Sequence, residues 1–231
     1  SSEKQIPTIH HNQKMDKFNF FFSNVSVWGS LVQSEVFSDI FKSQYQVIGI
    51  VETHNDVQKN IDMQARADAQ GFSISTNHAM QYDHTLGNHG GEAILASKPT
   101  FSLPIDPDVL ETASNVNDEK SRFTALQVRV KNVSMLTIVA YFWCNDGLSA
   151  RNWAILQQIS ALIWQYKLPF IMYADFNMPP ETITASGWLG EHRASLLVPD
   201  VVTTCKGSKF ILDYCAVSSS LVPFMTIEPV V

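Results

Sequence analysis

The sequence predicts an α/β protein in which sheets of mixed direction are covered by helices. Some apolar, strand-like segments are separated by a helical segment, as in units that build parallel sheets, whereas others follow one another directly, as in antiparallel hairpins. The chain of 231 residues is 45% hydrophobic and only 16% charged. This composition fits one large folded domain better than two and excludes a disordered chain.

The predicted strands are short apolar runs bounded by polar residues. They cover residues 18–28, 46–54, 72–76, 92–97, 122–130, 135–142, 169–174 and 210–217. The run 46–54 is apolar almost throughout, which is typical of a strand buried on both faces. A short polar turn separates 122–130 from 135–142, and this predicts a hairpin.

Three segments have the spacing of amphipathic helices. They cover residues 34–44, 55–71 and 149–167. Asn55 is the expected N-cap of the second, which Gly71 ends, and Ser149 is the expected N-cap of the third. Residues 104–121, and those from the end of 169–174 to about 202, are predicted to be loops.

Charge, cysteines and hydropathy exclude several classes of protein. The net charge of -6 argues against a broad basic face for nucleic acid. Three cysteines without a C-x-x-C pair indicate reduced thiols rather than a disulfide between Cys205 and Cys215. No apolar run reaches the roughly 18 residues of a membrane span, and the polar N-terminus is not a signal peptide.

Polar side chains recur where apolar strands end. Asn24, Glu52, Tyr141 and Asp175 each close an apolar run, and Asp213 lies inside another. A carboxylate beside a core is costly unless it is paired or bound to a cation. Several such acids on separate strands are best explained by one shared cation, and oxygen ligands without Cys or His favour Mg²⁺ or Mn²⁺.

The stretch "YADFNMPP" shows the pattern most clearly. Asp175 and Asn177 are two apart, so in an extended backbone they point the same way while Phe176 points into the core. An acid beside an amide suits water attack on phosphorus, since the acid takes the proton and the amide fixes the water and a phosphoryl oxygen. The two prolines hold the following loop away from the strand end.

Five motifs in order resemble the endonuclease/exonuclease/phosphatase superfamily. They are "SNVSVWGSL", "VETH", "GGEAIL", "YADFN" and "SKFILDYCAVS", and they run from about residue 18 to 222. The E-T-H form and the tyrosine that ends a central strand look closest to abasic-site endonucleases and to the nicking endonucleases of non-LTR retrotransposons. The resemblance implies a DNase I-like four-layer α/β/β/α sandwich of two mixed sheets, and a Mg²⁺-dependent hydrolase with DNA as substrate.

The resemblance also implies roles for the residues at the strand ends. Glu52 would bind the metal, with Asn24 hydrogen-bonding beside it. Asp175 would position or deprotonate the attacking water, and Asn177 would help to bind the phosphate. Tyr141 would stabilise charge on the scissile phosphate.

Two further residues would support this centre. Asp213 would orient a histidine, and Thr204 would supply a hydroxyl, although Thr203 fits nearly as well. The family places that histidine on a strand after the I-D-Y acid, and no His follows Asp213 here. We therefore expect a mobile lead-in over 1–17 and a domain over 18–231 that lacks its last strand.

Simpler interpretations stay open for each residue. Asp175 alone fits an Asx turn, Glu52 an acid before a helix, and Tyr141 a core position. The histidines His54 and His89 fit loop positions, Lys120 and Arg122 a solvated surface, and Trp188 a packed loop anchor.

At the level of function, the alternatives are a non-catalytic binding module and a phosphatase of inositol phosphates or phospholipids. DNA is the expected partner and a membrane is not. Oligomeric state and compartment are open, with an intracellular or nuclear setting assumed.

Overall fold

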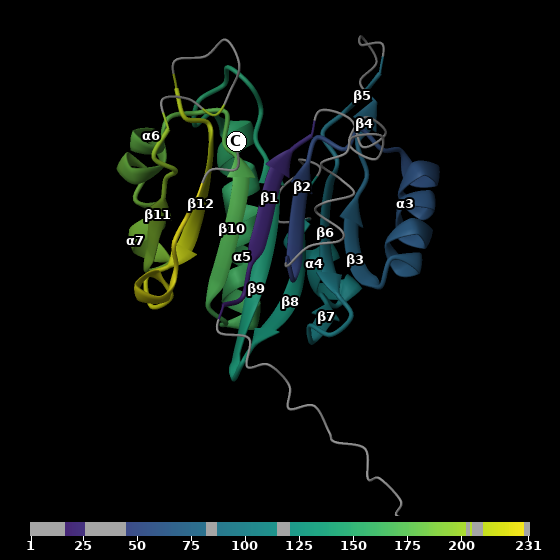
Figure 1. Cartoon of the computed structure of the whole chain (residues 1–231). Coiled ribbons are helices and arrows are strands. Elements are labelled where there is room, and N and C mark those ends of the chain that lie inside the picture. The colour runs from purple at the N-terminus through teal and green to yellow at the C-terminus, as the bar shows by residue number, and fades with distance from the viewer. Residues whose placement is uncertain are drawn as a thin grey trace, which may run out of the picture.

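The structure is a computed structural model that describes residues 17–25, 45–81, 87–114, 121–201, 204 and 210–228. The predicted lead-in up to residue 16, the predicted helix 34–44 and most of "SNVSVWGSL" lie outside these ranges. The mixed α/β architecture that the sequence predicts is confirmed, and Figure 1 shows its strands grouped between helices.

The first sheet has the strand order β1-β2-β6-β3. Its strands are β1 (Phe20–Asn24), β2 (Val47–Val51), β3 (Phe72–Asn77) and β6 (Glu92–Ser97). β1 and β2 are parallel, while β6 runs antiparallel to both of its neighbours. The helix α3 (Val57–Ala69) covers the outer face of this sheet through Met63 and Ala67.

The second sheet has the order β11-β12-β10-β9-β8-β7. Its strands are β7 (Ser102–Pro104), β8 (Phe123–Val130), β9 (Val133–Tyr141), β10 (Phe170–Asp175), β11 (Ala194–Leu197) and β12 (Asp213–Ser218). Only β9 and β10 are parallel, because α5 (Ala150–Tyr166) carries the chain between them. The hairpin β8–β9 confirms the predicted one.

Smaller elements complete the described part of the chain. They are the helices α4 (Pro107–Ser114), α6 (Pro180–Ala185) and α7 (Trp188–Glu191), the strands β4 (Met80–Gln81) and β5 (Asn88–His89), and the 3-10 turn η1 (Val222–Phe224). No helix in the described ranges is long and apolar enough to cross a membrane.

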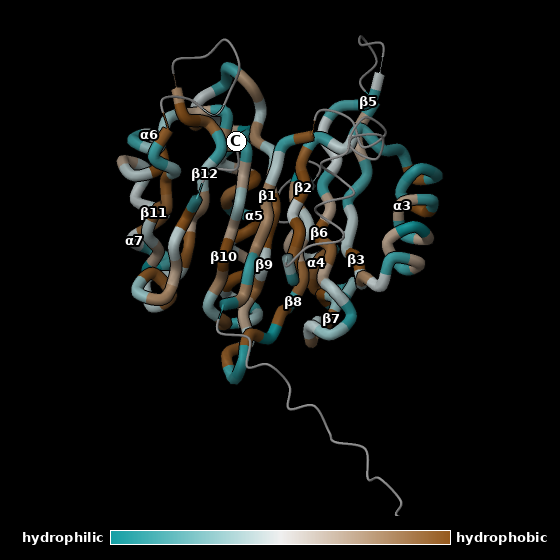
Figure 2. The backbone as a smooth tube through the Cα atoms, viewed as in Figure 1, coloured by the Kyte–Doolittle hydropathy of each residue, from teal (hydrophilic) through white to brown (hydrophobic). Residues whose placement is uncertain are grey.

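Three apolar cores separate four layers. One lies between α3 and the first sheet, one between the two sheets, and one between the second sheet and the helices α4, α5 and α7. Figure 2 shows hydrophobic residues concentrated along the strands and hydrophilic residues on the outer turns of α3. The layering is the predicted α/β/β/α sandwich of two mixed sheets.

The two sheets approach closely at Gly49 in β2. A Cβ atom there would lie 2.6 Å from Cγ1 of Val139 in the second sheet and closer still to the ring of Phe22. Real Cβ contacts are never so short, so only glycine allows these strands to face each other at this spacing.

Several predicted boundaries are wrong. Helix α3 begins after Asp56, whose side chain accepts from the Lys59 N–H, and not after Asn55, which is buried. The predicted loop 104–121 contains α4, and the loop up to residue 202 contains α6, α7 and β11. These elements are too short to show a clear period in the sequence. Asp213 is the first residue of β12 rather than an interior one.

Candidate functional site

The candidate residues lie at one rim of the core between the two sheets. In β1, Phe20 and Phe22 pack into this core, and Asn24 is the next residue with the same period of two. In β10, Ile171 and Tyr173 pack into it, and Asp175 follows. Because side chains alternate along a strand, both polar groups face the space between the sheets at its edge.

Tyr141, Asp175 and Asp213 form one row across three neighbouring strands. Asp175 lies opposite Tyr141 of β9 and opposite Asp213 of β12. The parallel pair brings two strand ends together, and the antiparallel pair brings the start of β12 to the same edge. The position of Asp213 at the start of its strand, which sequence reasoning missed, is therefore what places it beside Asp175.

Asp175 links the two sheets. Its side chain is only 7% exposed. Oδ2 accepts a hydrogen bond from Nδ2 of Asn24 at 2.9 Å, and Oδ1 accepts one from the backbone N–H of Asn177 at 3.1 Å. Burial, and then the nearby Asp213, raise the pKa of Asp175 to about 7, and Glu52 adds to the shift. The carboxyl is thus held where it exchanges a proton near neutral pH.

Asn177 is placed by a turn and not by an extended strand. Its φ of 50° is left-handed, so the prediction that Asp175 and Asn177 share an extended backbone is wrong. The contact from its N–H to Asp175 is an Asx turn, the simpler interpretation considered for Asp175. The same turn lets Nδ2 of Asn177 donate to the carbonyl oxygen of Phe142 at 2.9 Å, while Phe176 is fully buried as predicted.

Asp213 is held by hydroxyl groups on both sides. Its Oδ1 accepts from the Tyr173 hydroxyl at 3.1 Å. Oγ1 of Thr204 accepts the backbone N–H groups of Leu212 and Asp213 at 2.8 and 2.9 Å. Burial raises the pKa of Asp213, whereas its hydrogen bonds to Thr204 and Tyr173 oppose this rise. Thr204 therefore contacts the backbone at the start of β12, while Thr203 lies outside the described residues.

Glu52 follows β2 in a constrained backbone. Glu52 and His54 have φ values of 60° and 54°, and the segment is tied down because the N–H groups of Thr53 and His54 donate to the carbonyls of Gly91 and Gly90. Left-handed non-glycine residues are costly and are concentrated at functional sites. The backbone thus turns Glu52 off the strand at the rim, where it is close enough to raise the pKa of Tyr141.

The side chain of Tyr141, in the second sheet, lies near Glu52 at the rim. It is 7% exposed, and its hydroxyl lies 3.3 Å from Sγ of Cys144. Burial raises the pKa of Tyr141 well above its usual range, helped by the hydrogen bond to Cys144 and by the nearby Glu52. The phenol therefore stays protonated and remains a donor.

His54 lies in a loop, as the simpler interpretation expects, whereas His89 is the last residue of β5, so the loop position expected for it is wrong. The rings of His54 and His89 have centroids 6.3 Å apart. Desolvation lowers the pKa of His54, against the effect of Glu52. Within the ranges that the structure describes, no three His, Cys, Asp or Glu side chains form a group that could hold a metal ion.

Sequence reasoning misplaced Arg122 and did not single out Trp143. Arg122 was expected on a solvated surface, yet it is only 4% exposed. Its Nε donates to the carbonyl oxygen of Tyr141 at 2.9 Å, and its Cζ lies 4.6 and 4.0 Å from the ring centroids of Tyr141 and Trp143. The position of Arg122 directly before an apolar strand was the one feature of the sequence that could have indicated its burial. Trp188, by contrast, is the buried anchor that was predicted.

Comparisons with known proteins establish the fold. No family model matches the sequence, and no curated protein matches it. Solved structures do match: the AP endonuclease LMAP from Leishmania major has a TM-score of 0.62 at 13% identity, over 95% of this chain and 86% of that one. The endonuclease domain of TRAS1, a telomere-specific non-LTR retrotransposon, has a TM-score of 0.55 at 13% identity, over 90% and 88%.

A third similar structure is that of ANGEL2, a 2′,3′-cyclic phosphatase. Its TM-score is 0.57 at 12% identity, over 87% of this chain and 83% of that one. Structures described as endonuclease/exonuclease/phosphatase family proteins match as well. The chain thus has the fold of the superfamily that its motifs resemble.

Proposed function

We propose that this chain is a divalent-metal-dependent phosphodiesterase that cuts DNA. The observation that carries the proposal is the row formed by the buried Asp175 and the half-buried Asp213, tied to the opposite sheet by Asn24 and lying near Glu52. Three carboxyl groups at one rim repel one another, and a divalent cation relieves that repulsion. The fold shared with an AP endonuclease and a retrotransposon endonuclease supports the same class of reaction.

The donor set suits Mg²⁺ or Mn²⁺. The rim supplies carboxylate and amide oxygens, with Glu52 as the proposed ligand and Asn24 beside it. Mg²⁺ keeps several waters and is commonly held by one or two carboxylates. The ion would neutralise charge on the phosphate and lower the pKa of a bound water.

Each of the other residues at the rim has its own proposed role in the reaction. Asp175 takes the proton of the attacking water, since both of its oxygens are held in place and its pKa lies near 7. The amide of Asn177, fixed on the carbonyl of Phe142, donates to a phosphoryl oxygen. The protonated phenol of Tyr141 donates to the oxygen on which charge develops. Asp213, held by Thr204 and Tyr173, is proposed to orient a further group and not to touch the phosphate.

Nicking of supercoiled plasmid tests the proposal. The chain should nick DNA with Mg²⁺ and not with EDTA. Glu52→Gln and Asp175→Asn should each lower the rate by about a hundredfold or more, because each removes a group that acts at the phosphate. Glu111→Gln on α4 and Asp68→Asn on α3 make the same chemical changes at exposed positions and should nick normally.

Three results would count against the proposal. Nicking that persists in EDTA would exclude the role of the metal. An inactive chain whose plasmid binding is unaffected by Glu52→Gln would instead favour a non-catalytic binding module. Hydrolysis of a 2′,3′-cyclic nucleotide or an inositol phosphate, without nicking of plasmid, would show that the chain hydrolyses phosphate esters but that DNA is not its substrate.

A further inference from the structure

A stack of alternating aromatic rings and guanidinium groups leads outward from the rim. Cζ of Arg122 lies between the rings of Tyr141 and Trp143, 4.6 and 4.0 Å from their centroids. Cζ of Arg151 lies 4.4 Å from the Trp143 centroid. The stack therefore connects Tyr141, at the proposed reaction centre, to an arginine on the surface. Arg122, Trp143 and Arg151 are called the Trp143 ledge below.

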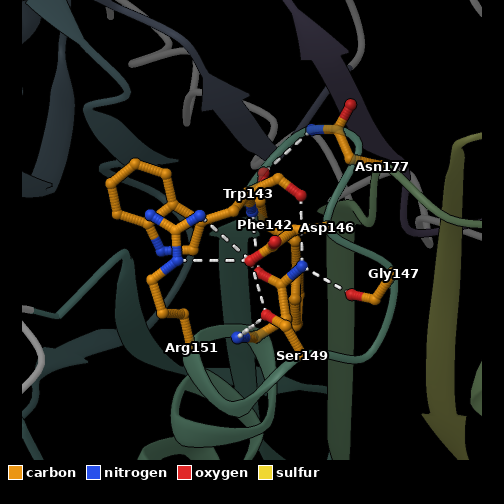
Figure 3. A network of polar contacts seen from close by, with 8 residues as sticks. Phe142, Trp143, Asp146, Gly147, Ser149, Arg151 and Asn177 are labelled. Carbon is orange, nitrogen blue, oxygen red and sulfur yellow. Dashed lines mark hydrogen bonds and ion pairs between the residues drawn. The ribbon is translucent and has the colours of Figure 1, made fainter.

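The loop that carries Trp143 is fixed at both ends (Figure 3). Oδ1 of the buried Asn152 accepts the Trp143 N–H at 2.8 Å. Its Nδ2 donates to the carbonyls of Trp143 and Gly147 at 3.1 and 2.7 Å. At the other end, Asn177 donates to the carbonyl of Phe142. The ledge is thus held rigidly relative to a residue of the proposed reaction centre.

The head group of Arg151 is oriented before any ligand arrives. Nε and Nη2 lie 3.2 and 3.1 Å from Oδ2 of Asp146, and Figure 3 shows Arg151 beside the indole of Trp143. Asp146 is itself fixed by the hydroxyl of Ser149. With one edge of its planar group engaged and its side chain 47% exposed, Arg151 keeps further N–H donors that can reach an anion.

The position of Arg151 in α5 argues for a use outside the helix. It is the second residue of α5, where a cation opposes the positive end of the helix dipole. The ion pair with Asp146 and the contact with the Trp143 ring offset part of this cost. A bound ligand with negative charge at this point would offset the cost further.

We propose that the Trp143 ledge binds a backbone phosphate of a nucleic acid strand, next to the phosphate that is cut. This rests on the proposed function, since it takes the rim at Tyr141 as the place of the scissile phosphate. A substrate with a single phosphate would occupy the rim alone, whereas a polynucleotide carries the next phosphate along the stack to Arg151. Phosphate contacts of this kind position a strand without reading its sequence.

Binding in EDTA tests the ledge without any cleavage. A fluorescein-labelled single-stranded oligodeoxynucleotide is titrated with the chain at several NaCl concentrations, and fluorescence anisotropy reports the affinity. Arg151→Ala should weaken binding about tenfold, the effect of one charge-assisted contact. It should also reduce the slope of log affinity against log salt by about one, the change expected for one lost phosphate contact.

Arg129 provides the matched control. It too is an exposed arginine over an aromatic ring, with Cζ 5.8 Å from the Phe101 centroid. It lies near the β8–β9 turn, opposite Ser134 and at the far end of β9 from Tyr141. Arg129→Ala should leave affinity and salt slope unchanged. Arg151→Lys should restore the slope and only part of the affinity, because a lysine keeps the charge but loses the planar fork.

The outcomes separate this proposal from the previous one. If Arg151→Ala and Arg129→Ala changed the oligonucleotide affinity equally, or if neither changed it, the proposed role of the Trp143 ledge would be wrong. Plasmid nicking would still test the proposed cleavage independently. Binding to vesicles that contain phosphatidylinositol 4-phosphate, with no oligonucleotide binding, would overturn the proposed role of the ledge as well. A chain that binds the oligonucleotide through Arg151 but does not nick plasmid would contradict the proposed cleavage and support the proposed role of the Trp143 ledge.

Discussion

At the scale of single residues, Asp175 combines a structural role with a proposed chemical role, and the two oppose each other. Its oxygens tie β1 to β10 through Asn24 and close the turn at Asn177. The same burial makes its ionised form unfavourable, which is why its pKa rises to about 7. An uncharged amide would avoid this cost at high pH, although it could accept only one of the two hydrogen bonds.

Asp175→Asn is therefore predicted to stabilise the metal-free chain at pH 8 and not at pH 3.5. In the unfolded chain an Asp has a pKa of about 3.9, so at low pH the carboxyl is protonated in both states. As the pH rises from about 4 to about 7, the unfolded state loses the proton first, and the stability that depends on protonated Asp175 is lost. Urea unfolding in EDTA at both pH values measures the difference.

Asp68→Asn is the control for this comparison, because Asp68 lies on the surface of α3. The variant should show little change in stability at either pH. A gain from Asp175→Asn that is equal at pH 3.5 and pH 8 would contradict the raised pKa.

Thr204→Val is predicted to destabilise the chain by about 1–3 kcal/mol, the usual cost of leaving half-buried amide groups without a partner. The backbone N–H groups of Leu212 and Asp213 lose their acceptor. Thr204→Ser keeps the hydroxyl and should retain most of the stability in urea unfolding. A valine variant as stable as the serine variant would show that Thr204 does not hold the start of β12.

Single residues were predictable where a regular pattern carried them. The period of two in β1 and β10 leads from apolar core residues to Asn24 and Asp175, so the sequence alone indicates a shared rim. Asn177 and Arg122 were placed wrongly because a left-handed turn and the burial of a guanidinium depend on distant partners. Those partners, the carbonyls of Phe142 and Tyr141, meet them only in the folded chain.

At the scale of elements, the spacing of the two sheets depends on β2. Gly49→Ala is predicted to destabilise the chain by about 1–3 kcal/mol, as overpacking of a filled core does. The added methyl would press on Phe22 and Val139, which lie below the rim. Urea unfolding measures the loss, and plasmid nicking should fall with it because the contact between Asn24 and Asp175 spans the same gap.

Gly190→Ala in α7 is the matched control, since nothing lies within 4 Å of a Cβ atom added there. Gly190→Ala should lower the free energy of unfolding only slightly. If both variants were equally stable, the close approach of the sheets at Gly49 would not be a real constraint.

Elements were predictable in proportion to their length. The helix α5 was found with its Ser149 cap because 17 residues give several turns of apolar spacing. The helices α6 and α7 and the strand β11 were missed because four to six residues leave no period to detect. Asp213 was assigned to a strand interior because Ile211 and Leu212 extend the apolar run, although β12 begins only at Asp213.

At the scale of the whole molecule, the fold brings two sheets together so that one rim collects side chains from both. Asn24 and Glu52 come from the first sheet, and Tyr141, Asp175 and Asp213 from the second. The layering followed from the order of strands and helices together with the resemblance to a known superfamily. The contact between the sheets did not, because no local pattern records which strand faces which.

The central claim is that this rim holds one divalent cation through Glu52. Calorimetric titration of Mg²⁺ into the chain at pH 7.5 tests it most directly, with Glu52→Gln and Glu111→Gln as the paired variants. We expect a single binding event that persists in Glu111→Gln and is lost in Glu52→Gln. An absence of Mg²⁺ binding, or binding that Glu52→Gln leaves intact, would contradict it.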